Sequence, residues 1–256
     1  MPTYRAGRHE FGQNFLTDRR VIATMVDLVR RTCGPIIEFG PGRGALTFPL
    51  QCLGRPITAV EIDEAHARHL RPRVAADTTI VRGDFLRYRL PQHPHVLVGN
   101  LPFELTTAVL RRILHAPTWQ QAVLMTQWEV ARRRAAVGGA TMMTAQWWPW
   151  FEFSLVERVP AAAFTPRPSV DGGLLTIRRR EHPLVPCAQQ KRYKAFVHAV
   201  FTGTGHGLPQ ILPRVVPSHR RGQVRRWLDG QRFRRRPLPR DLSSAQWAEL
   251  FTLAMK

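Results

Sequence analysis

Short apolar runs alternate with longer amphipathic stretches over the first half of the chain. Five such runs cover residues 35–39, 57–63, 79–81, 95–99 and 122–126. Apolar runs of this length, bounded by turn residues, are typical of strands that are buried on both faces. Their alternation with helical segments predicts βαβ units and a parallel sheet.

Two later segments, 151–157 and 174–177, also have the pattern of strands. They alternate or run apolar, and they flank a proline-rich loop at residues 164–170. We expect them to pair in an antiparallel arrangement at one edge of the sheet.

The pattern changes to helices and loops after Arg180, and residues 181–186 have the composition of a linker. The chain has the length of one domain of ordinary size with a small appendage. We therefore predict an α/β domain over residues 1–180 and a small helical domain over residues 181–256.

The charge of the chain indicates a polyanionic partner. Lys and Arg number 38 against 18 Asp and Glu, which gives a net charge of +20. Residues 181–256 hold 14 basic and 4 acidic residues, so their net charge per residue is over twice that of the rest. Such an excess favours nucleic-acid binding through phosphates, although any single cluster is equally compatible with a solvated surface. The clusters are Arg5 and Arg8, Arg111 and Arg112, Arg132–Arg134, Arg178–Arg180, Arg220 and Arg221, Arg225 and Arg226, and Arg234–Arg236.

Several classes of protein are disfavoured. No apolar stretch is long enough for a membrane span, and residues 1–10 carry charges where a signal peptide needs an apolar core, so we expect a cytoplasmic protein. Three widely spaced cysteines and ten unpatterned histidines predict neither a disulfide framework nor a metal site. The tryptophans of segment 147–150 are expected to pack in a core rather than stack on bases.

A glycine-rich loop, residues 40–44, follows the first predicted strand. Absent side chains there let the backbone approach a ligand at the carboxyl edge of the sheet. Glu61 ends the next strand about 20 residues on, where a carboxylate can accept hydrogen bonds from both ribose hydroxyls of a nucleoside cofactor. Asp84 follows the third strand and is a candidate ligand for an adenine amino group, with a loop-capping role as the alternative. Dinucleotide-binding oxidoreductases share the first two features.

The tetrapeptide Asn100-Leu101-Pro102-Phe103 argues against a dinucleotide-binding oxidoreductase, which has no such motif at this strand. It stands at the end of the fourth predicted strand and offers an amide oxygen, a backbone carbonyl beside a stiff proline, and an aromatic face. These are the groups needed to hold a planar exocyclic amine, and adenine N6 is the predicted target.

Taken together, the motifs resemble those of the ribosomal RNA adenine N6-methyltransferases. Among them, the erythromycin-resistance enzymes of actinobacteria are most similar, and these methylate one adenine in the macrolide-binding region of 23S rRNA. The resemblance is strong over residues 8–180 and looser after that. It rests on segments 11–16, 38–44, 61–63, 83–85, 100–103 and 164–170, with 196–207 as the segment similar to the actinobacterial members.

The resemblance implies a Rossmann-like fold that binds S-adenosylmethionine. Asn14 and Leu16 would form part of the lid of the cofactor pocket, and the Gly40 backbone would contact the methionine moiety. Glu61 would bind the ribose and Asp84 the adenine, with Asn100 also bordering the cofactor.

The same resemblance assigns Asn100, Leu101 and Phe103 to the target base. Phe103 stands where many of these enzymes have tyrosine, which keeps the ring face. Phe164 would stack on the extruded base from the other side, with packing in the core beneath its loop as the alternative. The predicted partner is 23S rRNA, protein-free or in an assembling large subunit, and the predicted state is a monomer without metal.

Three rival functions remain open. Small-subunit rRNA dimethyltransferases of ribosome assembly share nearly every motif, but they have Asn after the tetrapeptide where this chain has Glu104. DNA adenine methyltransferases need a target-recognition domain for which the chain is too short. A non-catalytic nucleic-acid-binding factor on the same fold would have no use for intact Glu61, Asp84, Asn100 and Phe103.

Overall fold

The computed structural model describes residues 14–231, 233 and 236–255. The motif residues 11–13 and four of the arginines in the predicted clusters, Arg5, Arg8, Arg234 and Arg235, lie outside the described residues. The chain divides into two compact units, one made of Met1–Ala131 with Leu155–Ile177 and the other of Arg132–Ser154 with Arg178–Lys256.

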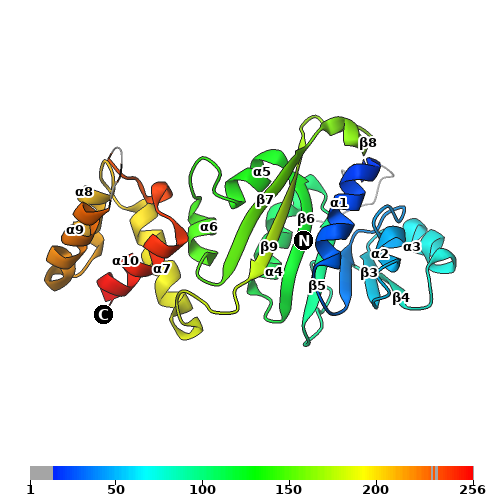
Figure 1. Cartoon of the computed structure of the whole chain (residues 1–256), viewed down its shortest axis with the longest axis horizontal. Coiled ribbons are helices and arrows are strands. Elements are labelled where there is room, and N and C mark those ends of the chain that lie inside the picture. Colours follow the sequence, from blue (N-terminus) through cyan, green and yellow to red (C-terminus); the bar gives the residue numbers. More distant parts are fainter. Residues whose placement is uncertain (1–13, 232, 234–235, 256) are drawn as a thin grey trace, which may run out of the picture. The chain divides into compact units, whose positions relative to one another are not determined.

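A seven-stranded sheet forms the centre of the fold, with the strand order β4-β3-β2-β5-β6-β9-β7 (Figure 1). Neighbouring strands from β4 to β6 pair in parallel, which confirms the predicted parallel sheet. The strands are β2 (Ile36–Phe39), β3 (Ile57–Glu61), β4 (Thr78–Arg82), β5 (His95–Asn100), β6 (Trp119–Gln127), β7 (Phe151–Val159) and β9 (Gly172–Arg179).

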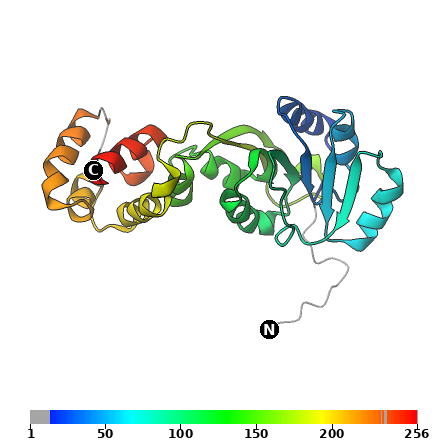
Figure 2. The same ribbon diagram turned by 90° about the horizontal axis from the view of Figure 1, so that it is seen from below.

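Helices cover both faces of this sheet (Figure 2). All four residues of β2 are buried, as a strand covered on both faces requires. One covering helix, α1, begins after Asp18, whose carboxylate accepts hydrogen bonds from the first-turn N–H groups and so caps it. Its Val21, Met25 and Val29 belong to the core that includes β2, β5 and β6. The helices of this part are α1 (Arg19–Arg30), α2 (Thr47–Gln51), α3 (Glu64–Leu70), α4 (Thr106–His115) and α5 (Trp128–Arg134).

The predicted antiparallel edge is confirmed. Arg158 near the end of β7 pairs with Asp171 just before β9, at 2.7 Å. At the other end of the two strands, Arg178 in β9 pairs with Glu152 in β7, at 2.5 Å. The start of each strand therefore lies beside the end of the other.

A second sheet of two short strands is absent from the sequence-based prediction. Strand β1 (Phe15–Leu16) pairs antiparallel with β8 (Phe164–Thr165), and the Thr17 N–H donates to the Ala163 carbonyl at 2.8 Å. Strands of two residues are too short to produce a periodic pattern. This pairing brings the N-terminal segment to the proline-rich loop.

The predicted change to helices after Arg180 is confirmed. Tyr193, Phe196, Trp247 and Phe251 make edge and tilted ring contacts in the core of the second unit. The helices of this unit are α6 (Met142–Trp147), α7 (Gln190–Thr202), α8 (Leu208–Val215), α9 (Arg221–Gly230) and α10 (Ser244–Met255).

The division between the units differs from the predicted boundary at residue 180. Residues 132–154 belong to the second unit because α6 packs against α7, where the Tyr193 hydroxyl donates to the Ala145 carbonyl at 3.0 Å. Trp147 and Trp150 are buried and contact each other edge to face, which confirms that they pack in a core. Whether the second unit binds RNA stays a prediction.

Glu38 is a buried acid in the central strand. Its side chain is 1% exposed, and its Oε2 accepts a hydrogen bond from the Thr47 hydroxyl at 2.7 Å. Burial raises the pKa of Glu38 from 4.5 to about 8; the Thr47 hydrogen bond acts against this rise and the charge of Glu61 adds to it. Glu38 is therefore mostly protonated at neutral pH.

The raised pKa of Glu38 makes stability depend on pH. The folded chain holds this proton more tightly than the unfolded chain, so the stabilisation is complete below pH 4.5 and is lost as the pH rises through about 8. Each pKa unit is equivalent to about 1.4 kcal/mol. We expect the unfolding free energy, measured in urea between pH 5 and 8, to fall by a few kcal/mol more in the wild type than in Glu38→Gln.

Glu64→Gln, at an exposed position of α3, is the matched control, and its pH dependence should follow that of the wild type. Equal slopes for the wild type and Glu38→Gln would contradict the assignment of a raised pKa.

Candidate active site

The order of strands places a switch point between β2 and β5. The chain leaves β2 toward β3 on one side and returns to β5 on the other, and open α/β sheets bind ligands beyond the carboxyl ends of the strands at such a point. Gly40 follows β2, Glu61 ends β3 and Asn100 ends β5. Three of the predicted site residues therefore meet at one edge of the sheet.

The glycine loop needs its glycines for conformation and space. Gly40 and Gly42 have φ angles of 58° and 55°, which side chains rarely adopt. A Cβ at Gly42 would lie 2.8 Å from Cε1 of Phe15, whereas no atom lies within 4 Å of the corresponding position at Gly40. The backbone at Gly40 is thus open to a ligand, which fits its predicted contact with the cofactor.

Glu61 is a preorganised acceptor. Its side chain is 1% exposed, and its two oxygens accept hydrogen bonds from the N–H groups of Gly42 and Asp63, each at 2.9 Å. A carboxylate offers about four lone-pair positions. Acceptor capacity therefore remains for two ribose hydroxyls, so the buried carboxylate and the open glycine backbone together fit a nucleoside cofactor.

A cavity of about 40 Å³ joins these groups to the tetrapeptide. Sequence reasoning gave Phe15 no role, yet its ring covers Gly42, lies under the Arg43 guanidinium at 5.0 Å and contacts His66 edge-on at 5.5 Å. The only signal in the sequence was its position between the predicted lid residues. The cavity is lined by Asn14, Phe15, Gly40, Gly42, Glu61, Asn100, Leu101 and Pro102.

Two of the predicted cofactor residues do not line this cavity. Leu16, the second residue of β1, is buried in the core. Asp84 caps its own loop, because its Oδ1 accepts a hydrogen bond from the Leu86 N–H at 2.8 Å, as the capping alternative requires. The loop is nonetheless tied to the site, since the Gly83 N–H donates to the Glu61 carbonyl at 2.8 Å. Their roles toward a cofactor stay predictions.

A hydrogen bond fixes the Asn100 amide. Its Nδ2 donates to the Asn14 carbonyl at 2.7 Å, and this orientation makes Oδ1 the atom that can accept from a substrate. The Leu101 N–H donates to the Met125 carbonyl of β6 at 3.0 Å, which ties the tetrapeptide to the neighbouring strand. The structure therefore gives the tetrapeptide the rigid amide and backbone that holding an amine requires.

Phe103 and Phe164 meet edge to face, with ring centroids 6.2 Å apart and planes at 73°. Phe103 is half-buried in the short 3₁₀ turn Phe103–Leu105. Phe164 is 2% exposed and belongs to the core, as the packing alternative requires. Contact with an extruded base stays a prediction for both rings, and for Phe164 it would require the ring to become accessible.

The arginines of the predicted RNA-binding clusters differ in their surroundings. Arg112 donates to a backbone carbonyl of the loop after β4, Arg134 to a threonine hydroxyl and Arg180 to Glu152. Hydrogen bonds within the protein therefore hold part of the positive charge. Arg221 and Arg225 of α9 are exposed, and Arg225 lies 4.0 Å from Asp229.

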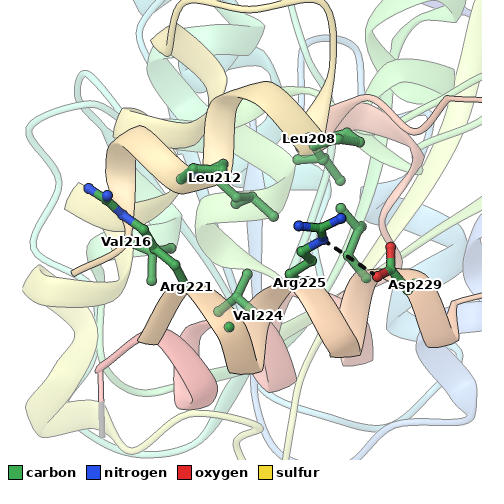
Figure 3. Close-up of a pocket in the computed structure, with 11 residues that line it drawn as sticks. Leu208, Leu212, Val216, Arg221, Val224, Arg225 and Asp229 are labelled. Atoms are coloured by element: carbon green, nitrogen blue, oxygen red, sulfur yellow. Dashed lines mark ion pairs between the residues drawn. The ribbon is translucent and has the colours of Figure 1, made fainter. Parts of the chain in front are cut away.

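A different hollow, of about 530 Å³, lies between α8 and α9 in the second unit. Leu208 and Leu212 of α8 and Val224 of α9 give it apolar walls, and Arg221 and Arg225 border it (Figure 3). It has no buried carboxylate, glycine loop or side-chain amide. The groups suited to hold a target amine and a nucleoside cofactor are thus found in the first unit.

Among residues 14–231, 233 and 236–255, no group of three or more His, Cys, Asp or Glu side chains is arranged to hold a metal ion. In the same part of the chain, no helix is long and apolar enough to cross a membrane.

Comparison with known proteins identifies the family. The sequence model described as ribosomal RNA adenine dimethylase matches residues 5–237. An rRNA adenine N-6-methyltransferase of Corynebacterium diphtheriae is 54% identical over 231 residues, covering 88% of this chain and 91% of the relative. The mycinamicin-resistance protein MyrB of Micromonospora griseorubida is 46% identical over 248 residues, covering 96% and 79%.

A solved structure has the same fold over nearly the whole chain. The crystal structure of the 23S rRNA methyltransferase ErmE matches with a TM-score of 0.86 and 34% identity, covering 95% of this chain and all of that one. The chain therefore belongs to the ribosomal RNA adenine dimethylase family and is an S-adenosylmethionine-dependent rRNA adenine N6-methyltransferase.

Proposed function

We propose that this enzyme methylates N6 of one adenine in the macrolide-binding region of 23S rRNA and so confers resistance to macrolides, lincosamides and streptogramin B antibiotics. Similarity to MyrB, a mycinamicin-resistance protein, and to the 23S rRNA methyltransferase ErmE supports this choice of substrate. The observation that carries the proposal is the hydrogen bond from Asn100 to Asn14, because it joins the predicted target-base residues to the predicted cofactor pocket.

The proposed substrate is protein-free or assembling large-subunit rRNA, and the enzyme acts on it as a monomer in the cytoplasm. A net charge of +20 suits a polyanion of this kind. The exposed arginines of α9 would contact phosphates, which gives affinity without reading the base sequence.

S-adenosylmethionine, when bound, supplies a methyl group on a sulfonium cation. The residues that would hold it are Glu61, through the ribose hydroxyls, and Gly40, through its open backbone. Asn14 and Asn100 border the same cavity. Because in-line transfer requires close alignment of acceptor and donor, a rigid pocket supplies much of the rate enhancement.

The Asn100 Oδ1 and the Leu101 carbonyl would accept the two hydrogens of adenine N6. These two acceptors draw the amine toward a pyramidal geometry, in which its lone pair faces the methyl group. Phe103 would stack on the purine, and the negative face of its ring favours the positive charge that develops on N6.

The target adenine must leave the base stack to reach these groups, at a cost of a few kcal/mol. The methylated amine is cationic and acidic enough to lose its proton to solvent. The reaction therefore needs no general base, and we assign none.

A panel of substrates tests the proposal. The enzyme is incubated with radiolabelled S-adenosylmethionine and, separately, with protein-free large-subunit rRNA, small-subunit rRNA and duplex DNA. We expect label on one adenine of the large-subunit rRNA, mapped by primer extension. Label on the small-subunit rRNA would assign the enzyme to ribosome assembly. No label on any substrate would favour a nucleic-acid-binding factor.

Removing the amide of Asn100 should abolish most of the activity. Asn100→Ala loses both the proposed N6 acceptor and the bond to the Asn14 carbonyl, so we expect kcat for large-subunit rRNA to fall roughly 100-fold or more. Gln121→Ala removes an amide from β6 away from the site and should leave kcat unchanged. If Asn100→Ala has the kcat of the wild type, the proposed role of Asn100 is refuted.

The arginines of α9 should control affinity and its dependence on salt. We expect the double variant Arg221→Gln, Arg225→Gln to bind rRNA more weakly and to lower the slope of log K against log salt by about 1 to 2. Binding is measured by fluorescence anisotropy between 50 and 300 mM salt, at about 25 °C.

Arg30→Gln with Arg68→Gln is the matched control, since it removes the same charge from exposed arginines that pair within their own helices. If both double variants change the slope equally, net charge rather than α9 controls the affinity.

A further inference from the structure

A second hollow lies at the same edge of the sheet as the candidate active site. It measures about 460 Å³ and follows the end of β6. Its walls come from three places in the chain, and they are lined by Gln127, Trp128, Glu129, Arg158, Ser169, Val170 and Asp171. None of these residues has a role in the methyl transfer described above.

The hollow contains a layered platform. The Arg158 guanidinium lies over the Trp128 ring, 5.3 Å from its centroid. Its Nε and Nη2 donate to the same oxygen of Asp171, at 2.8 and 2.7 Å. The other Asp171 oxygen accepts from the Ala161 N–H at 2.9 Å. The guanidinium plane is therefore held by a tryptophan beneath it and a fixed carboxylate at its edge.

The groups around Asp171 favour its ionised form, so it is a fixed anionic partner for Arg158. The Ala161 N–H and then the Arg158 hydrogen bond lower the pKa of Asp171, and the charge of Arg167 lowers it further. Arg167 is exposed on the proline-rich loop, and the Arg158 side chain remains 60% exposed. Asp171 thus faces two cations, Arg158 and Arg167, and the Arg158 guanidinium is largely open to solvent. A second acidic residue, Glu129, also lines the hollow.

The platform is close to the tetrapeptide through a short series of contacts. The Trp128 N–H donates to the Asp171 carbonyl at 2.9 Å. At the next residue, a Cβ on Gly172 would lie 2.9 Å from Cζ of Phe164 and 3.0 Å from the sulfur of Met125. Phe164 in turn contacts Phe103. One residue of β9 therefore separates the hollow from the ring that borders the target site.

We propose that this hollow binds the nucleotide next to the target adenine, with its base stacked on the outer face of the Arg158 guanidinium and its phosphate near Arg167. The inference rests on the proposed function. RNA-binding proteins stack unpaired bases on aromatic rings and on arginine planes, and such stacking tolerates any base because each has a π-face. Extruding the target adenine leaves a neighbouring base without its stacking partner, and the platform replaces that partner.

The test uses short RNA hairpins that carry the target adenine. In two of them, the nucleotide on the 5′ or the 3′ side is abasic. We expect one of the abasic RNAs to have a KM about tenfold higher with the wild-type enzyme, as the loss of one stacked base implies. Arg158→Lys keeps the positive charge toward Asp171 but loses the planar guanidinium. It should therefore raise KM for intact RNA about tenfold. For that abasic RNA, its KM should equal that of the wild type.

The control is Arg20→Lys, because Arg20 pairs with Glu157 at 2.9 Å, one residue before Arg158 on the same strand. It should leave both KM values unchanged. Thermal unfolding and the Kd for S-adenosylmethionine of Arg158→Lys should match the wild type. Trp128→Phe should retain more affinity for intact RNA than Trp128→Leu, since only phenylalanine keeps a flat support.

Three results would overturn the inference. One is a wild-type KM that is insensitive to both abasic neighbours while the target is methylated; this leaves the proposed function intact. Another is an equal rise in KM for Arg158→Lys on intact and abasic RNA, which would indicate a structural role. The third is no methylation of any RNA, which would overturn the proposed function as well.

Discussion

The hydrogen bond from the Asn100 amide to the Asn14 carbonyl connects two parts of the site that are 86 residues apart in the sequence. Asn100 ends a buried central strand, whereas Asn14 lies just before a strand of two residues. The bond distinguishes the nitrogen of the amide from its oxygen, because the nitrogen donates to the Asn14 carbonyl. The chemistry proposed for the tetrapeptide depends on this assignment, since only the oxygen can accept from an amine.

Much of the fold could be predicted from the sequence because its central strands are covered on both faces. Continuous apolar runs then mark the strands, and all five parallel ones were found. The sheet β1–β8 was missed because two residues carry no period. The division between the units differs from the predicted boundary for another reason: residues 132–154 lie before or at the start of β7, yet their helix α6 packs against α7. Contacts of this kind are decided by tertiary packing rather than by local pattern.

The part of the candidate site that lies at the ends of the central strands was predictable from the sequence. Gly40, Glu61 and Asn100 follow or end central strands, and parallel pairing brings strand ends together. Asp84 and Phe164 lie in loops, where a residue type alone does not tell a ligand from a cap or a packed ring. Asp84 caps its loop and Phe164 is buried. The role of Phe15 depends on a close approach to Gly42 that no sequence spacing encodes.

The pairing of β1 with β8 links the segment beside the candidate cavity to the proline-rich loop. Phe15, which covers Gly42 beside the candidate cavity, is the register partner of Thr165, the neighbour of Phe164. A cavity of about 40 Å³ is smaller than the roughly 300 Å³ of typical ligand pockets, and Phe15 is one of the residues that line it. Through the β1–β8 pairing, a displacement of Phe15 on cofactor binding would reach the loop of Phe164, whose ring contacts Phe103. If the donor changes the enzyme's affinity for RNA in this way, reciprocity requires RNA to change the affinity for the donor by the same factor.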